Sequence, residues 1–132
     1  MNTARYDPSG AGTQTAALGF GGTPAGAATE SFNGTTWTTV NSLNTPRAKL
    51  AGAGTQTAAL GFGGTGPTSA TESWDGTSWT SSPVGLATAR FYLAGCGTQT
   101  AALAFAGATP TVSSATEAWT GQALQTKTIT VS

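Results

Sequence analysis

One unit, repeated three times, makes up almost the whole chain, and this repetition limits the possible folds more than any other feature. The stretch GAGTQTAALGFGGT occupies residues 10–23 and returns unchanged at residues 52–65, and a third copy, GCGTQTAALAFAGA, occupies residues 95–108. The glycine before Thr-Gln-Thr stands at positions 12, 54 and 97, so the period is 42 and then 43 residues. A period of this length is typical of arrays in which each repeat is one supersecondary unit.

Each unit shows the pattern of four short strands and no pattern of a helix. The first strand is predicted at residues 48–53 and 91–96, a Gly-Thr-Gln-Thr turn follows, and Ala-Ala-Leu-Gly-Phe supplies the second strand. A third strand ends at Asn33-Gly34 or Asp75-Gly76, which are strong hairpin signals, and a fourth strand rich in Thr and Trp follows the hairpin. Loops of variable length join the second strand to the third, at residues 22–27, 64–69 and 107–114.

Four-stranded units of about 40–50 residues predict an all-β fold, a β-propeller built of antiparallel blades. Blades converge on a central axis, so the first strand of each unit needs small side chains. The segments LAGAG and LAGCG contain few large ones. On the second strand Leu and Phe share one face, with Ala or Gly between them, at Leu18, Phe20, Leu60, Phe62, Leu103 and Phe105. We divide this single half-propeller, residues 1–132, into blade one (1–43), blade two (44–86) and blade three (87–132).

Three short motifs recur at matching places in the units. They are a glycine doublet after the second strand, an aromatic turn followed by Trp, and a segment ending in Arg that leads into the next unit: Gly21-Gly22 and Gly63-Gly64, Phe32-Asn33-Gly34 and Trp74-Asp75-Gly76, Leu43-Asn44-Thr45-Pro46-Arg47 and Leu86-Ala87-Thr88-Ala89-Arg90. Through them the chain resembles kelch-type β-propellers, which implies a fold more than a function. Its Thr/Ala/Gly-rich repeats are also similar to those of tailed-phage structural or tail-associated proteins.

The chain departs from the kelch pattern in blades one and three. Ala106-Gly107 replaces the glycine doublet, and the ending ALQTKTITVS replaces the Trp-bearing fourth strand. Pro8 stands where the other units have Leu50 and Leu93, a substitution that an edge strand tolerates because one of its sides is unpaired.

Three blades are too few to close a propeller, which needs roughly four to eight. Two apolar blade faces would be left in water, and faces of this kind seek partners. We therefore expect a homodimer, in which two copies meet head to tail about a two-fold axis and form a six-bladed ring. The alternatives are a piece of a longer propeller, or an engineered propeller fragment with no function of its own.

Six of the ten charged residues recur with the repeat, which favours a structural role over a catalytic one. We predict ion pairs between neighbouring blades, Glu30 with Arg47 and Glu72 with Arg90, so that Glu117 requires Arg5 of a second copy. Pairing within one blade, Arg5 with Glu30, is the alternative.

Composition gives little support for chemistry at a site. With no His and one Cys there is no zinc or copper ligand cluster and no Ser-His triad, so we expect no metal, no cofactor and no enzymatic activity. Cys96 replaces an alanine on a first strand and is interpreted as a small buried residue. Charged residues are 8% of the chain and the net charge is zero, so we expect no nucleic-acid or membrane partner.

One repeated polar set remains, the Thr-Gln-Thr turns with Gln14, Gln56 and Gln99. Hydrogen bonding within the turn is the favoured interpretation, and a rim that binds a glycan or a peptide is the other. Two function classes follow: a structural or adhesive module, on a phage tail or another extracellular assembly, and a carbohydrate-binding propeller. A phage origin implies a location in the virion or outside the cell; otherwise the location stays open.

Overall fold

The computed structural model describes residues 1–121 and 124–127, which form three separate four-stranded sheets. In each sheet the strands follow chain order and every neighbouring pair is antiparallel. The bounds are β1 (Ser9–Thr13), β2 (Ala16–Phe20), β3 (Thr29–Phe32) and β4 (Trp37–Val40); β5 (Ala51–Gly54), β6 (Ala59–Phe62), β7 (Thr71–Trp74) and β8 (Trp79–Ser81); and β9 (Ala94–Thr98), β10 (Ala101–Phe105), β11 (Thr116–Trp119) and β12 (Leu124–Lys127). The predicted four-stranded units and their order are confirmed.

The described residues contain no helix. In particular, none of them forms a helix with the length and hydrophobicity of a membrane span.

The first strands of blades two and three begin later than predicted. Strand β5 begins at Ala51 and β9 at Ala94, so residues 48–50 and 91–93 lie in the connection that precedes each strand. Lys49 and Tyr92 have positive φ angles of 59° and 55°, in the left-handed region, which an extended strand cannot include. The apolar residues in this connection are buried for another reason: Leu50 and Leu93 pack between blades.

The hairpins between the third and fourth strands form at the predicted turns. In blade one the Asn33 side-chain oxygen accepts hydrogen bonds from the backbone N–H groups of Thr35 and Thr36, at 3.0 and 2.9 Å. Asp75 does the same for Thr77 and Ser78 in blade two, at 2.8 and 2.7 Å. This interchange of Asn and Asp is therefore turn chemistry, as an Asx-type turn requires.

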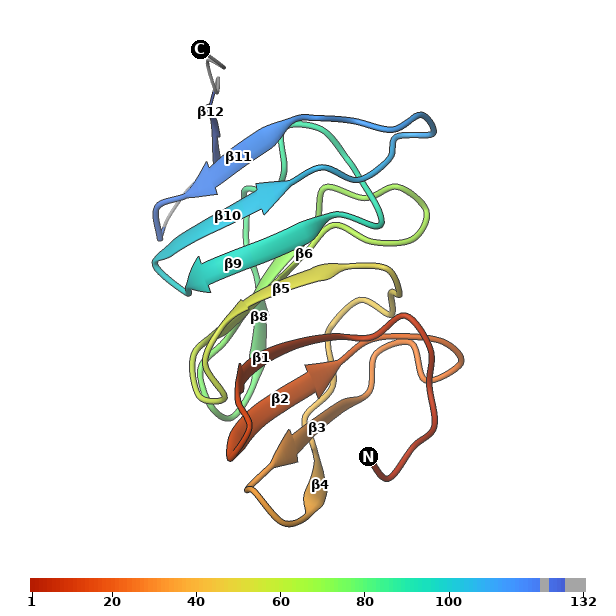
Figure 1. The fold of residues 1–132 in the computed structure, drawn as a ribbon, viewed down its shortest axis with the longest axis vertical. Coiled ribbons are helices and arrows are strands. Elements are labelled where there is room, and N and C mark those ends of the chain that lie inside the picture. The colour runs from red at the N-terminus through yellow and green to blue at the C-terminus, as the bar shows by residue number, and fades with distance from the viewer. Residues whose placement is uncertain (122–123, 128–132) are drawn as a thin grey trace.

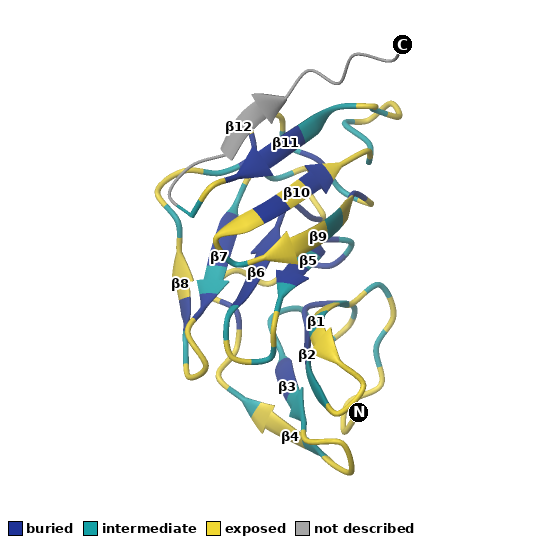
Figure 2. Ribbon diagram, turned by 60° about the vertical axis from the view of Figure 1, so that its left-hand side comes forward, coloured by how far each residue is buried: buried dark blue, intermediate teal, exposed yellow. Residues whose placement is uncertain are grey.

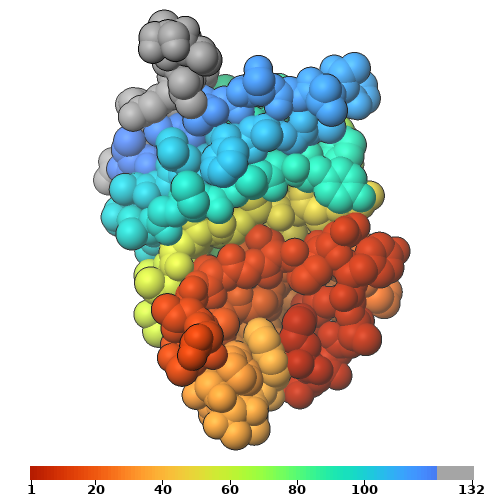
Figure 3. All heavy atoms as spheres, viewed as in Figure 1, coloured from red at the N-terminus to blue at the C-terminus, as the bar shows by residue number. Residues whose placement is uncertain are grey.

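The blades follow one another along the long axis of the molecule, and the space-filling view shows them as successive bands of colour (Figure 3). The innermost strands β1, β5 and β9 lie side by side (Figure 1), and β5 contacts both of its neighbours. The apolar core lies between blades, where Leu18 and Phe20 of β2 pack with Leu50, Trp74 and Trp79 of blade two. Leu60 and Phe62 of β6 form the matching cluster with blade three. The predicted Leu/Phe face is thus the blade-to-blade contact.

Glycine on the inner strands allows this close approach. A Cβ atom placed on Gly52 would lie 2.6 Å from the carbonyl oxygen of Gly10 and 2.8 Å from Cζ of Phe20. A Cβ atom on Gly95 would lie 2.5 Å from Cζ of Phe62. Phe20 and Phe62 therefore each rest on the inner-strand glycine of the following blade.

The outer faces of blades one and three are uncovered within this chain. Leu103 is 37% exposed and Phe105 36% exposed, whereas their counterparts Leu18, Phe20, Leu60 and Phe62 are at most 1% exposed. Figure 2 shows the same contrast between exposed stretches of β1, β9 and β10 and buried β6. The interpretation of Cys96 as buried was wrong: it is exposed, because within the described residues no further blade covers this side of β9.

Candidate functional site

The periodic charges form three buried ion pairs, each within one blade. Arg5 pairs with Glu30 at 2.5 Å, Arg47 with Glu72 at 3.0 Å, and Arg90 with Glu117 at 2.8 Å. The predicted pairs between blades, Glu30 with Arg47 and Glu72 with Arg90, are therefore wrong, and Glu117 does not require Arg5 of a second copy. The alternative pairing within a blade is the one that forms.

Each arginine side chain crosses its own blade to reach the third strand. In blade two, Arg47 Nη1 donates to the carbonyl oxygens of Gly63 and Ala70 at 2.9 and 2.7 Å, and Nη2 donates to Glu72. The carboxylate of Glu72 also accepts the backbone N–H of Asn44 at 2.7 Å. This network holds the connecting segment 44–47 on the blade that follows it, which is the physical reason for the pairing within a blade.

The backbone of the same arginine binds the preceding blade. The N–H of Gly22 donates to the carbonyl of Arg47 at 3.0 Å, and the N–H of Arg47 donates to the carbonyl of Gly26 at 3.1 Å. At the next junction, Gly64 donates to the carbonyl of Arg90 at 2.8 Å. The arginines therefore do join neighbouring blades, but through main-chain atoms instead of their charges.

The Glu30 carboxylate predicts a dependence of stability on pH. Burial raises its pKa, but the N–H groups of Asn2 and Thr3 and the charge of Arg5 outweigh burial and hold the pKa below the ordinary value of 4.5. A depressed pKa contributes stability that is present above the ordinary value and is lost as pH falls towards the folded-state pKa. We expect the free-energy difference between wild type and Glu30→Gln, measured by urea unfolding, to shrink below about pH 4.5. A difference that is constant from neutral to acidic pH would contradict this.

Two of the three repeated glutamines link neighbouring blades. The side-chain nitrogen of Gln56, from blade two, donates to Phe32 O at 2.5 Å and Ser31 Oγ at 3.0 Å, and lies 3.3 Å from Ala17 O, all in blade one. Gln99 donates in the same way to Trp74 O at 2.6 Å and Ala59 O at 3.1 Å in blade two. Their amide nitrogens are thus already used, which leaves little for a glycan or peptide at these two positions.

Gln14 differs from its two counterparts, which find their acceptors in the preceding blade of this chain. It is exposed, and within the described part of the chain its side chain makes no hydrogen bond. The turn interpretation of these glutamines misses the contact across blades.

Removing the Gln56 side chain should destabilise the junction between blades one and two. We expect Gln56→Ala to lower the free energy of unfolding by about 1–3 kcal/mol, because partly buried acceptors lose their donor. Chemical denaturation monitored by tryptophan fluorescence measures this. Thr57→Ala is the matched control, since Thr57 is exposed in the same turn, and a loss of equal size in that variant would contradict the prediction.

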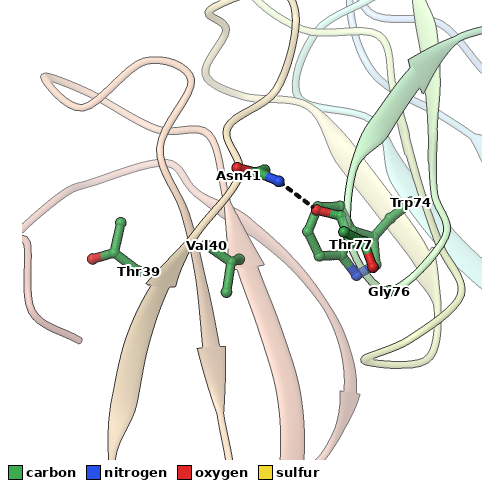
Figure 4. Close-up of a pocket in the computed structure, with 6 residues that line it drawn as sticks. All are labelled: Thr39, Val40, Asn41, Trp74, Gly76 and Thr77. Carbon is green, nitrogen blue, oxygen red and sulfur yellow. Dashed lines mark hydrogen bonds between the residues drawn. The ribbon is translucent and has the colours of Figure 1, made fainter.

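Two shallow grooves lie at the equivalent outer edges of the two junctions. The first has a volume of about 430 Å³ and is lined by Thr39, Val40, Asn41, Trp74, Gly76 and Thr77 (Figure 4). Asn41 donates a hydrogen bond across it to the carbonyl of Thr77 at 2.8 Å. The second, of about 390 Å³, is lined at corresponding positions by residues that include Ser82, Trp119 and Gly121. Trp74 and Trp119 are buried, so they offer little ring surface for stacking on a ligand.

A row of three dissimilar residues precedes the inner strands. Asp7, Lys49 and Tyr92 each stand two positions after the periodic arginine and each has a φ between 54° and 59°. Backbone hydrogen bonds link the three residues: the N–H of Lys49 donates to the carbonyl of Asp7 at 3.1 Å, and the N–H of Tyr92 donates to the carbonyl of Lys49 at 2.9 Å. We call these residues the inner row. The sequence analysis did not identify this row. The sequence does contain a sign of it, because most positions of the repeat keep the same residue type, whereas this position is acidic, basic and aromatic in turn.

The inner row also brings charge and an aromatic ring together. The ammonium nitrogen of Lys49 lies 4.6 Å from the centre of the Tyr92 ring. A hydrogen bond from Lys49 to Tyr92 and the nearby charge of Asp7 raise the pKa of Lys49, so its amine stays protonated at neutral pH. Residues 1–121 and 124–127 contain no group of three or more His, Cys, Asp or Glu placed to hold a metal ion.

Comparisons with known proteins identify the fold. The solved structure of YjhT is similar to this chain, with a TM-score of 0.78 over 94% of the chain at 12% sequence identity. The fold is β-propeller-like. At that identity the likeness concerns fold alone, and the chain spans about half, 51%, of the length of YjhT. No protein-family model matches the chain, and no curated protein matches it.

Proposed function

We propose that the chain is a non-enzymatic structural or binding module of the kelch type that acts as a six-bladed ring of two copies. One observation carries the proposal: blade one and blade three each have one uncovered face. Faces of the same two kinds are buried against each other at both internal junctions. Leu103 and Phe105, at 37% and 36% exposed, are apolar side chains of the kind that blades bury.

The surface available for binding lies at the end of the blades that carries the variable loops 22–27, 64–69 and 107–114. Large apolar side chains are exposed there, namely Tyr6 at 61%, Tyr92 at 57% and Val112 at 93%. Loops on a rigid scaffold commonly carry recognition. A role in a phage tail or an adhesion protein, with the corresponding location in the virion or outside the cell, belongs to this proposal.

The mass in solution tests the ring. Light scattering coupled to size-exclusion chromatography should give twice the chain mass of 13.0 kDa at micromolar concentration. A mass of one chain at all accessible concentrations would overturn the assembled ring.

The two exposed tyrosines favour carbohydrate binding as a second candidate, because aromatic rings stack on sugars. Tyr6 and Tyr92 lie at the same end of the molecule, beside the loops at Thr23 and Ala108. A glycan array separates the candidates. Binding that is lost in a variant with both tyrosines changed to Ala would support a carbohydrate ligand, and silence across the array would favour a structural module.

A further inference from the structure

We propose that the open face of blade three is a specific receptor for Gln14 of a second copy. Blade one of that copy docks on blade three in the way that blade three docks on blade two within the chain. The proposal rests on the proposed ring and names its contacts. The receptor is a groove of about 310 Å³ lined by Ala101, Ala102, Leu103, Ala118, Trp119 and Thr120. We call it the blade-three groove.

The strand register shows that this groove corresponds to the place on blade two where Gln99 of the next blade binds. Gln99 donates to Ala59 O and Trp74 O, which are opposite each other on β6 and β7. Ala102 and Trp119 are the opposite pair at the same place on β10 and β11, and both line the blade-three groove. The donor that matches this pair by repeat position is Gln14.

The apolar parts of the two open faces are complementary as well. At the internal junctions, Phe20 and Phe62 rest on Gly52 and Gly95 of the following blade. Phe105 is the matching phenylalanine and is uncovered. Gly10 is the matching glycine, and the one atom within 4 Å of a Cβ placed on it is the carbonyl oxygen of Leu18, in its own blade, at 3.1 Å. A second copy would bring Phe105 onto Gly10.

Tryptophan pairing follows the same rule. Trp79 packs edge to face on Phe20 of the preceding blade, with ring centres 4.8 Å apart, and its indole N–H donates to Thr29 Oγ1 at 3.1 Å. Trp37 is the counterpart in blade one and is only partly buried. Phe105 and Thr116 are the corresponding partners on blade three of a second copy.

A second copy suits this face better than an unrelated peptide because the chain itself carries both halves of the junction. Glutamine, glycine and tryptophan are present on the open side of blade one, and the acceptor pair, phenylalanine and threonine are present on the open side of blade three. The two open faces thus carry the same residue types as an interface that the chain already forms twice.

Two substitutions coincide at the proposed seam. Cβ atoms on Gly21 and Gly63 would lie 2.6 and 2.7 Å from the carbonyl oxygens of Arg47 and Arg90 in the next blade, yet blade three has Ala106 at this position. The residue opposite is Pro8, which is shorter than the Leu50 and Leu93 found at the internal junctions. The shorter Pro8 relieves the contact that Leu50 and Leu93 make at the internal junctions, but the Cβ of Ala106 would still crowd the backbone carbonyl opposite it. Ala106→Gly should therefore strengthen the dimer.

The test measures the dissociation constant of the dimer by sedimentation, using the whole 132-residue chain. Gln14→Ala should raise the constant roughly tenfold or more, because each ring contains the contact twice. Gly10→Val should abolish the dimer by placing a branched side chain under Phe105. Thr80→Val is the control, an exposed strand residue of blade two away from both open faces. Far-UV circular dichroism checks that each variant is folded.

The outcomes separate this inference from the proposed ring. A wild-type dimer that is weakened by Gln14→Ala and Gly10→Val, and unchanged by Thr80→Val, supports the proposal. A wild-type dimer that keeps its dissociation constant in Gln14→Ala overturns it and leaves the ring standing, held by other contacts. A wild-type monomer overturns the ring and this seam together.

Discussion

Glu72→Gln should lower the free energy of unfolding by about 3–5 kcal/mol, the usual cost of leaving one partner of a buried ion pair without the other. Arg47 is 3% exposed and Glu72 1% exposed, so neither charge can turn to water when its partner is lost. The Nε atom of Arg47 already lacks a hydrogen-bond partner within the described residues. Urea unfolding at neutral pH, followed by tryptophan fluorescence, measures the loss.

A double variant separates the charge from the fold around it. Glu72→Gln combined with Arg47→Met removes both charges, and well-packed neutral side chains can replace a buried pair at little cost. We expect the double variant to recover a substantial part of the stability lost in Glu72→Gln. A loss below about 1 kcal/mol in the single variant would place the pair with solvent-exposed ion pairs and contradict its burial.

Gly52→Val should be as damaging, for a steric reason. Its Cβ would lie 2.6 Å from Gly10 O and 2.8 Å from the Phe20 ring, and one of these atoms is backbone that cannot rotate away. Overpacking of this kind costs about 3 kcal/mol or more where the surroundings cannot move. Thermal unfolding should show a large fall in the midpoint temperature, and the emission of Trp79, which packs on Phe20, should change.

The same substitution at the equivalent position of blade one is the control. Within this chain no preceding blade lies against Gly10, so the fold of a single chain should tolerate Gly10→Val. Equal destabilisation of Gly10→Val and Gly52→Val in dilute solution would show that loss of glycine in the strand, and not contact between blades, is responsible.

Prediction from the sequence was most successful for features that depend only on local residues. The Asn33-Gly34 and Asp75-Gly76 turns, and the Leu/Phe face of the second strand, were predicted and are present. Turn chemistry acts over a few residues, and an apolar face on a short strand must be covered. These features therefore do not depend on how the blades are placed.

Contacts between two residues that each occur once in every repeat were harder to predict. Arginine and glutamate both recur once per unit, so the repeat fits pairing within a blade as well as pairing between blades. The distance along the chain favoured the wrong choice, since Glu30 is nearer in sequence to Arg47 than to Arg5. The contact of Gln56 with the preceding blade was missed for the same reason, because a turn residue and a linking residue have the same sequence pattern.

The position of a unit in the array was a second source of error. Cys96 matches Ala53 by repeat, yet Ala53 is 5% exposed and Cys96 is exposed. The difference comes from whether another blade follows. Equivalent positions of a repeat have the same sequence pattern, but only those covered by a neighbouring blade are buried.

The split attachment of the arginine segments has a consequence for how such chains change in length. The Arg47 and Arg90 segments each bind the preceding blade through main-chain atoms and the following blade through the arginine side chain, in the same manner at both junctions. A duplicated unit spliced into the middle would meet, on either flank, surfaces already suited to it. Gain or loss of whole units by recombination should therefore leave the remaining joints intact, and stability should change by steps of one unit and one joint.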